Sequence, residues 1–367
     1  MVALNRILVV NAGSSSLKLR VLDGHDSVVA SADLPAPREG TDVAALKETL
    51  ESFGGVDAVG HRVVHGGTLF QAPAVVDALV RQRLESLTDL APLHQPKSLG
   101  ALDAVSAVLP GPPAVACFDT AFHSTVPDYA ATYALPAEWR TRWTLRKYGF
   151  HGLSHAYVSR RAASLLGSPA GSRIVSCHLG AGASLCAVRD GRSVDTTMGF
   201  TPLDGLVMAT RSGAVDPGLV LWLEQHAGMP PAELAATLEY RSGLLGLAGT
   251  ADMRSVLSQA AAGDSRSLLA REVYLHRLHG CIASMAAALG GLDALVFTGG
   301  VGENSAEIRS RAMDGLGFLG VRADAACNDS GTGDREIGSS DAPVRSLVVS
   351  AREDIEIAGQ VRATLGP

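Results

Sequence analysis

The sequence lacks the features typical of secreted, disulfide-stabilised or nucleic-acid-binding proteins. Its five cysteines include no C-x-x-C pair, so neither a disulfide framework nor a structural zinc site is indicated, and reduced thiols in the core are expected. No basic run occurs, and the net charge of −6 argues against a nucleic-acid partner. The first residues show no charged segment followed by an apolar one, which is the pattern of a secretory signal. We therefore expect a cytoplasmic protein.

Long uncharged apolar runs are also missing. The least polar stretch, residues 282–301, contains Asp293 and many small residues, and it predicts a buried helix followed by a buried strand rather than a membrane span. Apolar residues nevertheless make up 47% of the 367 residues, which is enough for a large core and excludes extensive disorder. The length suggests two domains.

Strand and helix signals alternate along the chain. Short apolar runs predict strands at 7–10, 17–22, 56–64, 114–118, 174–178, 184–188, 295–298 and 346–350. Helical spacing of apolar residues occurs at 45–53, 74–90, 101–108, 219–226, 231–239, 270–289 and 354–365. This alternation predicts an α/β protein whose sheets are covered by helices.

One segment of the sequence is repeated. Residues 7–19 and residues 175–187 both consist of an apolar strand, a turn of small residues and a second strand, and the copies lie about half the chain apart. The spacing suggests two similar domains, each with one glycine-rich hairpin facing a shared cleft, and a boundary near residues 127–140. Chance similarity between two glycine-rich hairpins is the alternative.

The two hairpins have the composition of phosphate-binding loops. Successive backbone N–H groups, the hydroxyls of Ser14 and Ser16 and the charge of Lys18 could bind an oligophosphate, and Gly13 allows close approach. Neither G-x-x-x-x-G-K-[ST] nor a G-x-G-x-x-G turn leading into a helix is present, which argues against a P-loop protein and a Rossmann dehydrogenase. A plain tight hairpin is the alternative for each loop taken alone.

A third glycine-rich segment, residues 297–305, follows a predicted strand. Three glycines in four positions favour close approach by a nucleotide base or ribose, and Asn304 with Glu307 fits a capping box at the start of a helix. A simple strand–turn–helix junction would explain the same pattern.

Charged residues occur in otherwise apolar or glycine-rich segments. Arg62 and Arg211 are flanked by small or apolar residues, where a guanidinium is costly unless it meets an anion. His151 and His155 are four residues apart, as zinc ligands on a helix could be, but no acidic third ligand is adjacent. No nucleophile elbow is present. Arginines and histidines near glycine loops indicate a phosphotransferase.

Six segments in order give a specific resemblance. The sequence resembles the acetate/propionate/butyrate kinase family of the actin–Hsp70–sugar kinase superfamily, from about residue 7 to residue 358. The segments are Asn11-Ala-Gly-Ser-Ser-Ser-Leu-Lys18, Gly60-His-Arg-Val-Val-His-Gly-Gly67, Phe118-Asp-Thr-Ala-Phe-His123, Tyr148-Gly-Phe-His-Gly152, Met198-Gly-Phe-Thr-Pro202 and Gly300-Val-Gly-Glu-Asn304.

The resemblance implies two duplicated actin/ribonuclease H-like domains, with mixed sheets flanked by helices and an active site in the interdomain cleft. Residues 1–123 plus 355–367 would form an N-terminal acyl/phosphate-binding domain, and residues 124–354 a C-terminal nucleotide-binding and dimerisation domain. The implied partners are ATP and acetate or another short-chain carboxylate, with Mg²⁺ (or Mn²⁺) as cofactor and a homodimer as assembly. No membrane partner is expected.

The implied reaction is reversible, Mg²⁺-dependent transfer of the ATP γ-phosphoryl group to acetate by direct in-line displacement, giving acetyl phosphate and ADP. Propionate or butyrate kinase is the alternative within the family. An actin/Hsp70-like ATPase or regulatory nucleotide-binding protein is the alternative from another class, and ATP hydrolysis independent of acetate would be its sign.

The resemblance also assigns roles to individual residues. The implied catalytic residues are Arg62, Asp119, His151 and Arg211, and the implied metal ligands are Asn11 and Glu353. Acetate is already ionised at pH 7 and needs no base, so we expect Asp119 to position an arginine or a magnesium-bound water. The implied acyl-binding residues are Arg62, Val64, Leu93, His94, Phe150 and Pro202. The implied nucleotide-binding residues are Ser14, Ser16, Lys18, His178, Leu179, Gly180, Ala181, Gly182, Asp252, Met253, Arg254, Gly300, Val301, Gly302, Glu303 and Asn304.

Two positions depart from the family pattern. Ala181 stands where the second phosphate loop usually has asparagine, which removes one side-chain contact to the nucleotide and predicts a lower ATP affinity or a different phosphoryl donor. Gln95 stands where asparagine is common after His94.

Overall fold

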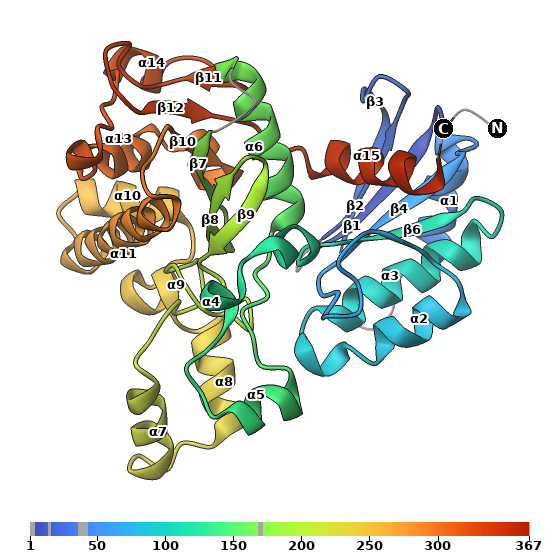
Figure 1. Cartoon of the computed structure of the whole chain (residues 1–367), viewed down its shortest axis with the longest axis horizontal. Coiled ribbons are helices and arrows are strands. Elements are labelled where there is room, and N and C mark those ends of the chain that lie inside the picture. The colour runs from blue at the N-terminus through green and yellow to red at the C-terminus, as the bar shows by residue number, and fades with distance from the viewer. Residues whose placement is uncertain (1–3, 14–15, 36–42, 168–171, 367) are drawn as a thin grey trace. The chain divides into compact units, whose positions relative to one another are not determined.

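The computed structural model describes residues 4–13, 16–35, 43–167 and 172–366. The chain divides into two compact units. Unit 1 comprises Met1–Ser124, Phe150–Tyr157 and Arg352–Pro367, and unit 2 comprises Thr125–Gly149 and Val158–Ala351. Figure 1 labels most elements of both units.

Unit 1 is built on a mixed six-stranded sheet of order β3-β2-β1-β4-β6-β5. The first three strands form an antiparallel meander, β4 and β6 run parallel to β1, and β5 is an antiparallel edge strand. The strands are β1 (Ile7–Ala12), β2 (Ser16–Leu22), β3 (Val28–Pro35), β4 (Ala58–Val63), β5 (Ala74–Val75) and β6 (Ala114–Phe118).

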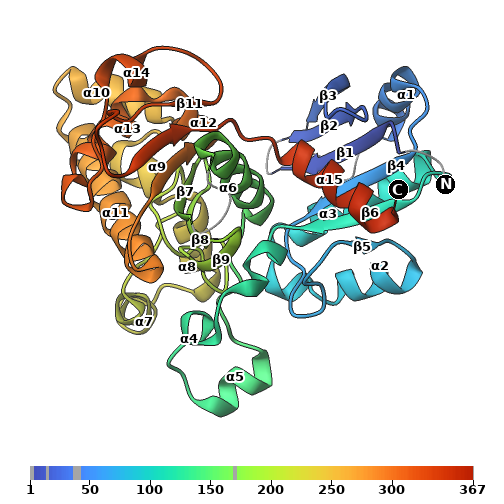
Figure 2. The same cartoon turned by 45° about the horizontal axis from the view of Figure 1, so that its top comes forward.

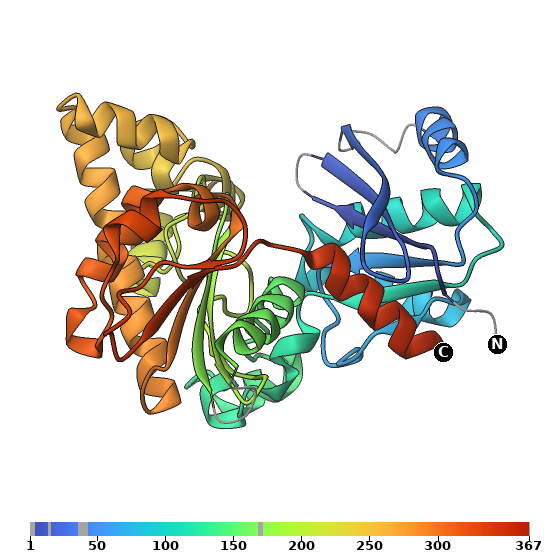
Figure 3. The same ribbon diagram turned by 90° about the horizontal axis from the view of Figure 1, so that it is seen from above.

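Helices cover both faces of this sheet. The C-terminal helix α15 (Glu353–Leu365) lies across β1, β4 and β6 on one face, while α1 (Val43–Phe53) and α3 (Gln95–Val108) pack on the other, as Figure 2 and Figure 3 show. A Cβ at Gly60 would lie 2.5 Å from Cγ2 of Ile357, so glycine allows α15 to approach β4. The remaining helices of this unit are α2 (Ala78–Glu85), short 3₁₀ turns at Thr88–Leu90 and Ala121–Thr125, and the start of α6 (Gly152–Leu166).

Unit 2 contains a second mixed sheet of order β11-β12-β10-β7-β8-β9. β7, β8 and β9 form an antiparallel meander, β10 runs parallel to β7, β12 runs parallel to β10, and β11 is an antiparallel edge strand. The strands are β7 (Arg173–Leu179), β8 (Ala183–Arg189), β9 (Arg192–Thr196), β10 (Ala294–Thr298), β11 (Arg335–Glu336) and β12 (Arg345–Val348).

The long helix α11 (Ser265–Leu289) lies against β7, β8 and β9, and the short helix α12 (Gly299–Asn304) lies against β7 and β10. The other elements of unit 2 are α4 (Asp128–Ala131), α5 (Ala137–Trp143), α7 (Pro217–Gln225), α8 (Pro231–Tyr240), α9 (Gly243–Ala248), α10 (Met253–Ala261), α13 (Ala306–Asp314), a 3₁₀ turn at Gly317–Leu319, α14 (Ala325–Asp329) and the rest of α6.

The two sheets have the same plan. In each, a three-stranded meander is followed by two strands parallel to the first, and a short antiparallel strand pairs with the last of these. The hairpins β1–β2 and β7–β8 occupy equivalent places, which confirms that the repeat in the sequence reflects duplicated structure. The predicted α/β class is also confirmed.

Several predicted elements were wrong in detail. The helix expected at 74–90 starts later, because residues 74–75 pair with β6 and Asp77 then caps α2 by accepting a hydrogen bond from the Val80 N–H at 2.7 Å. The glycines of 299–302 are helical, and Ser305 rather than Asn304 caps the following helix, α13. The apolar runs in the sequence also did not predict the strands β3 and β9.

Three of the five cysteines, Cys117, Cys177 and Cys186, are buried thiols, as expected. Cys281 is half-buried, and Cys327 is exposed, contrary to the expectation of a core position. Residues 282–301 contain the end of α11 and the buried strand β10, as predicted, and their last three residues begin α12. Across the described residues, the helices are too short or too polar to cross a membrane.

Candidate active site

A chain of hydrogen-bonded polar side chains lies at one edge of the unit 1 sheet. Asn11, Arg62 and Asp119 stand in or just after β1, β4 and β6, and the carboxyl ends of parallel strands meet at the same sheet edge. Nη2 of Arg62 donates to Oδ2 of Asp119 at 2.6 Å, and its Nε lies 3.0 Å from Oδ1. Nη1 of Arg62 donates to Oδ1 of Asn11 at 3.0 Å, and Nδ2 of Asn11 donates to Oε2 of Glu353 at 2.8 Å. Four of the predicted site residues are thus brought together.

Arg62 and Asp119 form a largely buried ion pair, with side-chain exposures of 16% and 2%. Burial by itself lowers the pKa of Arg62. The negative charges of Asp119 and Glu353 and the hydrogen bonds to Asp119 raise it by more than burial lowers it, so the pKa lies above its ordinary value. The guanidinium is therefore a permanent cation, held in a fixed plane by the carboxylate.

The tight turn that contains His151 is hydrogen-bonded to the backbone of Asp119 through Gly152. His151 adopts the left-handed backbone conformation, with φ of 57°, which is rare for a residue with a side chain. The Gly152 N–H donates to the Asp119 carbonyl at 2.9 Å, and a Cβ at Gly152 would lie 2.2 Å from that carbonyl oxygen. Nε2 of His123 lies 3.0 Å from the Phe150 carbonyl oxygen and donates to it. These contacts hold the turn in its strained form.

Gln95 fixes the loop after Arg62. Its side chain is buried, accepts from the His65 N–H at 3.1 Å and donates to the His65 carbonyl at 3.0 Å. Val64 and Phe150, both predicted to line the acyl pocket, are buried, and the Phe150 ring packs edge-on against the His65 ring. Leu93 is exposed, and His94 directly precedes α3.

In unit 2, Arg211 pairs with a residue that the sequence did not indicate. Nε of Arg211 donates to Oε1 of Glu239 at 2.6 Å, and both side chains are largely buried. Nη1 of Arg211 also donates to the Pro202 carbonyl at 3.4 Å. Gly213 and Gly243, with φ of 69° and 59°, allow the neighbouring turns to pack against each other.

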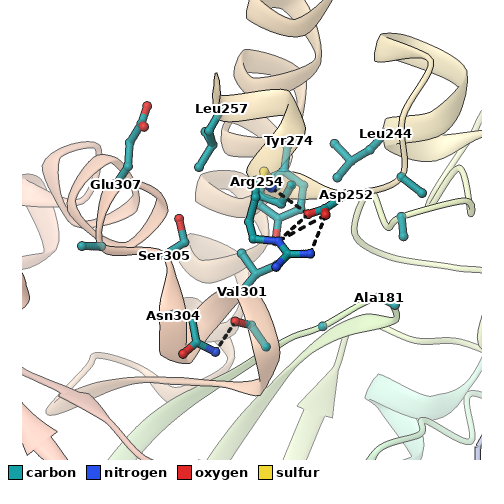
Figure 4. A pocket seen from close by; sticks show the side chains of 16 residues that line it. Ala181, Leu244, Asp252, Arg254, Leu257, Tyr274, Val301, Asn304, Ser305 and Glu307 are labelled. Carbon is teal, nitrogen blue, oxygen red and sulfur yellow. Dashed lines mark hydrogen bonds and ion pairs between the residues drawn. The ribbon is translucent and has the colours of Figure 1, made fainter. Parts of the chain in front are cut away.

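A pocket of about 650 Å³ opens in unit 2. Figure 4 shows Arg254 folded back onto Asp252, with Nη2 2.6 Å from Oδ2, and Asn304 donating to the Gly300 carbonyl. Hydrogen bonds from the side chain and backbone of Arg254 lower the pKa of Asp252. Predicted nucleotide-binding residues in the pocket wall are Gly180, Ala181, Asp252, Met253, Arg254, Gly300, Val301 and Asn304; Ala209, Leu244, Leu257, Tyr274, Ser305 and Glu307 join them.

The remaining predicted nucleotide residues lie on the hairpins or in α12. Lys18 is exposed on β2, directly opposite Asn11 on β1. Gly180 and Gly182 form a tight turn in which the N–H of the first donates to the carbonyl of the second at 3.0 Å. Ser16 begins β2, His178 and Leu179 end β7, and Ser14 lies outside the described residues.

The side chains of Glu303 and Arg309 form hydrogen bonds with the backbone of α12. The Glu303 carboxylate accepts hydrogen bonds from the Gly299 N–H at 2.9 Å and the Ala351 N–H at 3.0 Å. The buried guanidinium of Arg309 donates to the carbonyls of Gly302 and Glu303 at 3.0 and 2.8 Å. The pocket wall formed by α12 is therefore fixed by side chains beneath it.

Sequence reasoning missed Glu239 and Tyr274. Glu239 ends a helix that was predicted, but nothing local indicates a partner 28 positions away. Tyr274 occupies a helical core spacing on α11 and gives no sign that its ring lines the pocket.

Comparison with known proteins gives consistent matches. The acetate kinase of Shouchella clausii (strain KSM-K16) is 42% identical over 385 residues, covering 96% of this chain and 98% of that protein. Crystal structures of Porphyromonas gingivalis acetate kinase and of a propionate kinase from Francisella tularensis subsp. tularensis SCHU S4 both match with a TM-score of 0.90, at 34% and 37% identity. The first match covers 99% of this chain and 100% of the other chain, and the second covers 97% and 98%.

The equivalent sheets and the matched structures define a kinase with two duplicated actin-like α/β domains. A sequence model of the acetokinase family matches residues 40–359. The chain belongs to the acetokinase family.

Proposed function

We propose that this kinase transfers the γ-phosphoryl group of ATP to acetate, giving acetyl phosphate and ADP, and that it also catalyses the reverse reaction. The observation that carries the proposal is the partly buried chain of hydrogen bonds from Asp119 through Arg62 and Asn11 to Glu353. It presents a permanently charged guanidinium next to acidic and amide oxygens, as transfer between two anions requires. The similarity to proteins named acetate kinase supports the choice of acceptor.

Unit 1 would bind the acyl group and the phosphoryl group being transferred. A carboxylate acceptor is already an anion and needs no base, so Asp119 serves to fix the plane of Arg62, a role that its two-oxygen contact supports. His151 would add a donor to the transferring group. Val64 and Phe150 supply a small apolar surface for the methyl group, together with Leu93 and His94. Pro202, the other residue expected to bind the acyl group, belongs to unit 2.

Unit 2 would bind the nucleotide. The pocket of about 650 Å³ is large enough for a base and ribose, and its wall carries Asp252, Arg254 and Asn304 as polar groups. The backbone of the β7–β8 turn and His178 would bind the phosphates. Lys18, on the equivalent hairpin of unit 1, would supply a positive charge. Arg211 would stabilise the charge that develops during direct in-line displacement.

Asn11 and Glu353 suit a magnesium ion. Amide and carboxylate oxygens are hard donors, and Mg²⁺ commonly takes only one or two carboxylates together with substrate phosphates and waters. In the described part of the chain, no group of three or more His, Cys, Asp or Glu side chains could hold a metal by itself, so nucleotide phosphates would complete the shell. When bound, Mg²⁺ or Mn²⁺ would neutralise phosphate charge.

We also propose a homodimer formed through unit 2. The helix α7 has the sequence PGLVLWLEQ, and none of its residues, all of which the structure describes, is buried. Leu219, Leu221 and Trp222 are each about half exposed. A contiguous apolar helix surface of this kind is typical of an interface, and a second copy of the chain is the occupant that the family resemblance favours.

Trapping of the acyl phosphate with hydroxylamine tests the reaction. The full chain is incubated with acetate, propionate or butyrate, with ATP, GTP or pyrophosphate as donor, and with or without Mg²⁺. Acetohydroxamate formed with ATP and Mg²⁺ supports the proposal. A faster reaction with propionate would favour the second candidate, suggested by the match to a propionate kinase. ATP hydrolysis without any hydroxamate would reject both.

A further inference from the structure

Glu239 is a buried carboxylate at the end of a surface helix. It is only 7% exposed. Of the other residues of α8, Leu234 is also buried, residues 236–238 are half-buried and the rest are exposed. A buried carboxylate is costly unless a cation and hydrogen bonds compensate it. Its partner is Arg211, whose Nε lies 2.6 Å from Oε1.

The backbone segments that contain Arg211 and Glu239 are also joined by hydrogen bonds. The Thr210 hydroxyl donates to the Glu239 carbonyl at 2.9 Å, and the Ser212 N–H donates to the Leu238 carbonyl at 3.0 Å. The residues on both sides of Arg211 are thus attached to the last turn of α8. The side chain of Glu239 extends this attachment to the guanidinium itself.

The arrangement parallels that of the other candidate catalytic arginine. Asp119 contacts the Nε edge of Arg62, and Glu239 contacts the Nε atom of Arg211. A carboxylate on this edge sets the plane of the guanidinium before an anion arrives, so no reorganisation is needed during the reaction. Each unit therefore contains one arginine that is oriented by a buried acid.

We propose that Glu239 is a positioning residue for Arg211 in phosphoryl transfer. It acts through the arginine and does not itself contact the substrates. The inference rests on the proposed function, because it takes Arg211 to be a residue that stabilises transferring charge. Loss of Glu239 should lower kcat with little change in nucleotide binding, since the pocket wall contains neither residue.

A double-mutant cycle tests the proposal. Glu239→Ala, Arg211→Ala and the double variant are prepared in the full chain, and kcat and the KM values for acetate and ATP are measured by hydroxamate formation. Glu239→Ala should lower kcat by about 10- to 100-fold and change the KM for ATP by less than about 2-fold. In the Arg211→Ala background, Glu239→Ala should lower kcat by less than about 3-fold, because its effect passes through the arginine.

Two further variants guard against a purely structural explanation. Glu239→Gln keeps an acceptor for Nε without the charge and should retain more kcat than Glu239→Ala. Glu233→Ala removes an exposed carboxylate on the same helix, 3.7 Å from Arg241, and should leave kcat unchanged. Thermal unfolding and ADP binding are measured for every variant, so that rates refer to folded protein.

The outcomes separate the two proposals. Wild-type kcat in folded Glu239→Ala or Glu239→Gln overturns the positioning role, as does an equal loss of kcat with and without Arg211. A lower melting temperature with kcat per folded molecule unchanged also overturns it. If the unaltered chain forms no hydroxamate, the proposed function itself fails, and the role of Glu239 in it fails as well.

Discussion

The carboxylate of Asp119 holds one edge of the Arg62 guanidinium, with Oδ2 2.6 Å from Nη2 and Oδ1 3.0 Å from Nε. Removing this acid in Asp119→Ala should free the guanidinium to rotate and leave a largely buried charge without its carboxylate partner. We expect kcat to fall by about 100-fold or more and the free energy of unfolding by about 3 kcal/mol. Steady-state kinetics and urea denaturation check both effects.

A matched control exists in the same unit. Asp103 contacts Arg81 with the same two-oxygen geometry, at 2.7 and 2.8 Å, but the two side chains are more exposed, at 51% and 26%. Asp103→Ala should leave kcat unchanged and cost at most about 1 kcal/mol. Similar kinetic losses in both variants would contradict a specific role for Asp119.

Ala181 offers a gain-of-function test. It is exposed and lines the unit 2 pocket. The family resemblance leads us to expect asparagine at this position. Ala181→Asn should add one hydrogen bond to the nucleotide, worth about 1 kcal/mol, and lower the KM for ATP by about 5-fold. Initial rates at varied ATP concentration measure the change. Ala251→Asn, elsewhere in the same wall, is the control, and an unchanged KM in Ala181→Asn would refute the expectation.

Stability should depend on pH through a buried histidine. His61 is 1% exposed, and in the described part of the chain neither ring nitrogen has a hydrogen-bond partner. Burial lowers the pKa of His61 to about 4, against a smaller opposite effect of Asp103. Because the unfolded chain binds the proton more readily, this contribution is complete above pH 6.5 and is lost as the pH falls towards 4.

The loss attributable to His61 should reach about 2 kcal/mol at pH 5. His61→Leu should therefore reduce the difference in free energy of unfolding between pH 7 and pH 5 by about that amount. Urea denaturation at the two pH values measures it. His25→Gln, in an exposed turn, serves as the control. An unaltered pH dependence in His61→Leu would show that burial of this ring is not the cause.

The exposed face of α7 predicts the effect of a single charge on assembly. Leu221 is 52% exposed on a helix without buried residues among those described. Leu221→Asp should convert a dimer into a monomer, because a carboxylate in an apolar interface loses its hydration. Sedimentation velocity distinguishes the two states. Leu269→Asp changes an equally exposed leucine on α11 and should leave the assembly intact; dissociation of both variants, or of neither, would contradict the assignment.

The parts of the fold that sequence reasoning predicted are those governed by local patterns. Apolar runs identified most central strands, and the repeated hairpin indicated duplication. Arg62 was recognisable because it is flanked by small and apolar residues, and Asp119 was indicated by the family resemblance; the structure shows that both lie at the carboxyl ends of neighbouring parallel strands.

What sequence reasoning missed depends on tertiary contacts. Glycine disfavours helix, so 299–302 was expected to be a turn, but Glu303 satisfies the Gly299 N–H and Arg309 binds the last carbonyls of α12. The pairing of Arg211 with Glu239 joins two segments through the packing of α8, which no local pattern encodes. The edge strand β3 alternates exposed and half-buried residues, but its half-buried positions are Ala30, Ala32 and Leu34, so no continuous apolar run identifies it.

The backbone at His151 has a consequence for engineering. A left-handed conformation costs a side-chain-bearing residue about 1 kcal/mol or more, and glycine would adopt it without that penalty. Selection for thermal stability alone would therefore favour His151→Gly, which removes the imidazole. If His151 contributes to phosphoryl transfer as proposed, a variant stabilised in that way would lose turnover, so such a screen must measure activity as well as thermal stability.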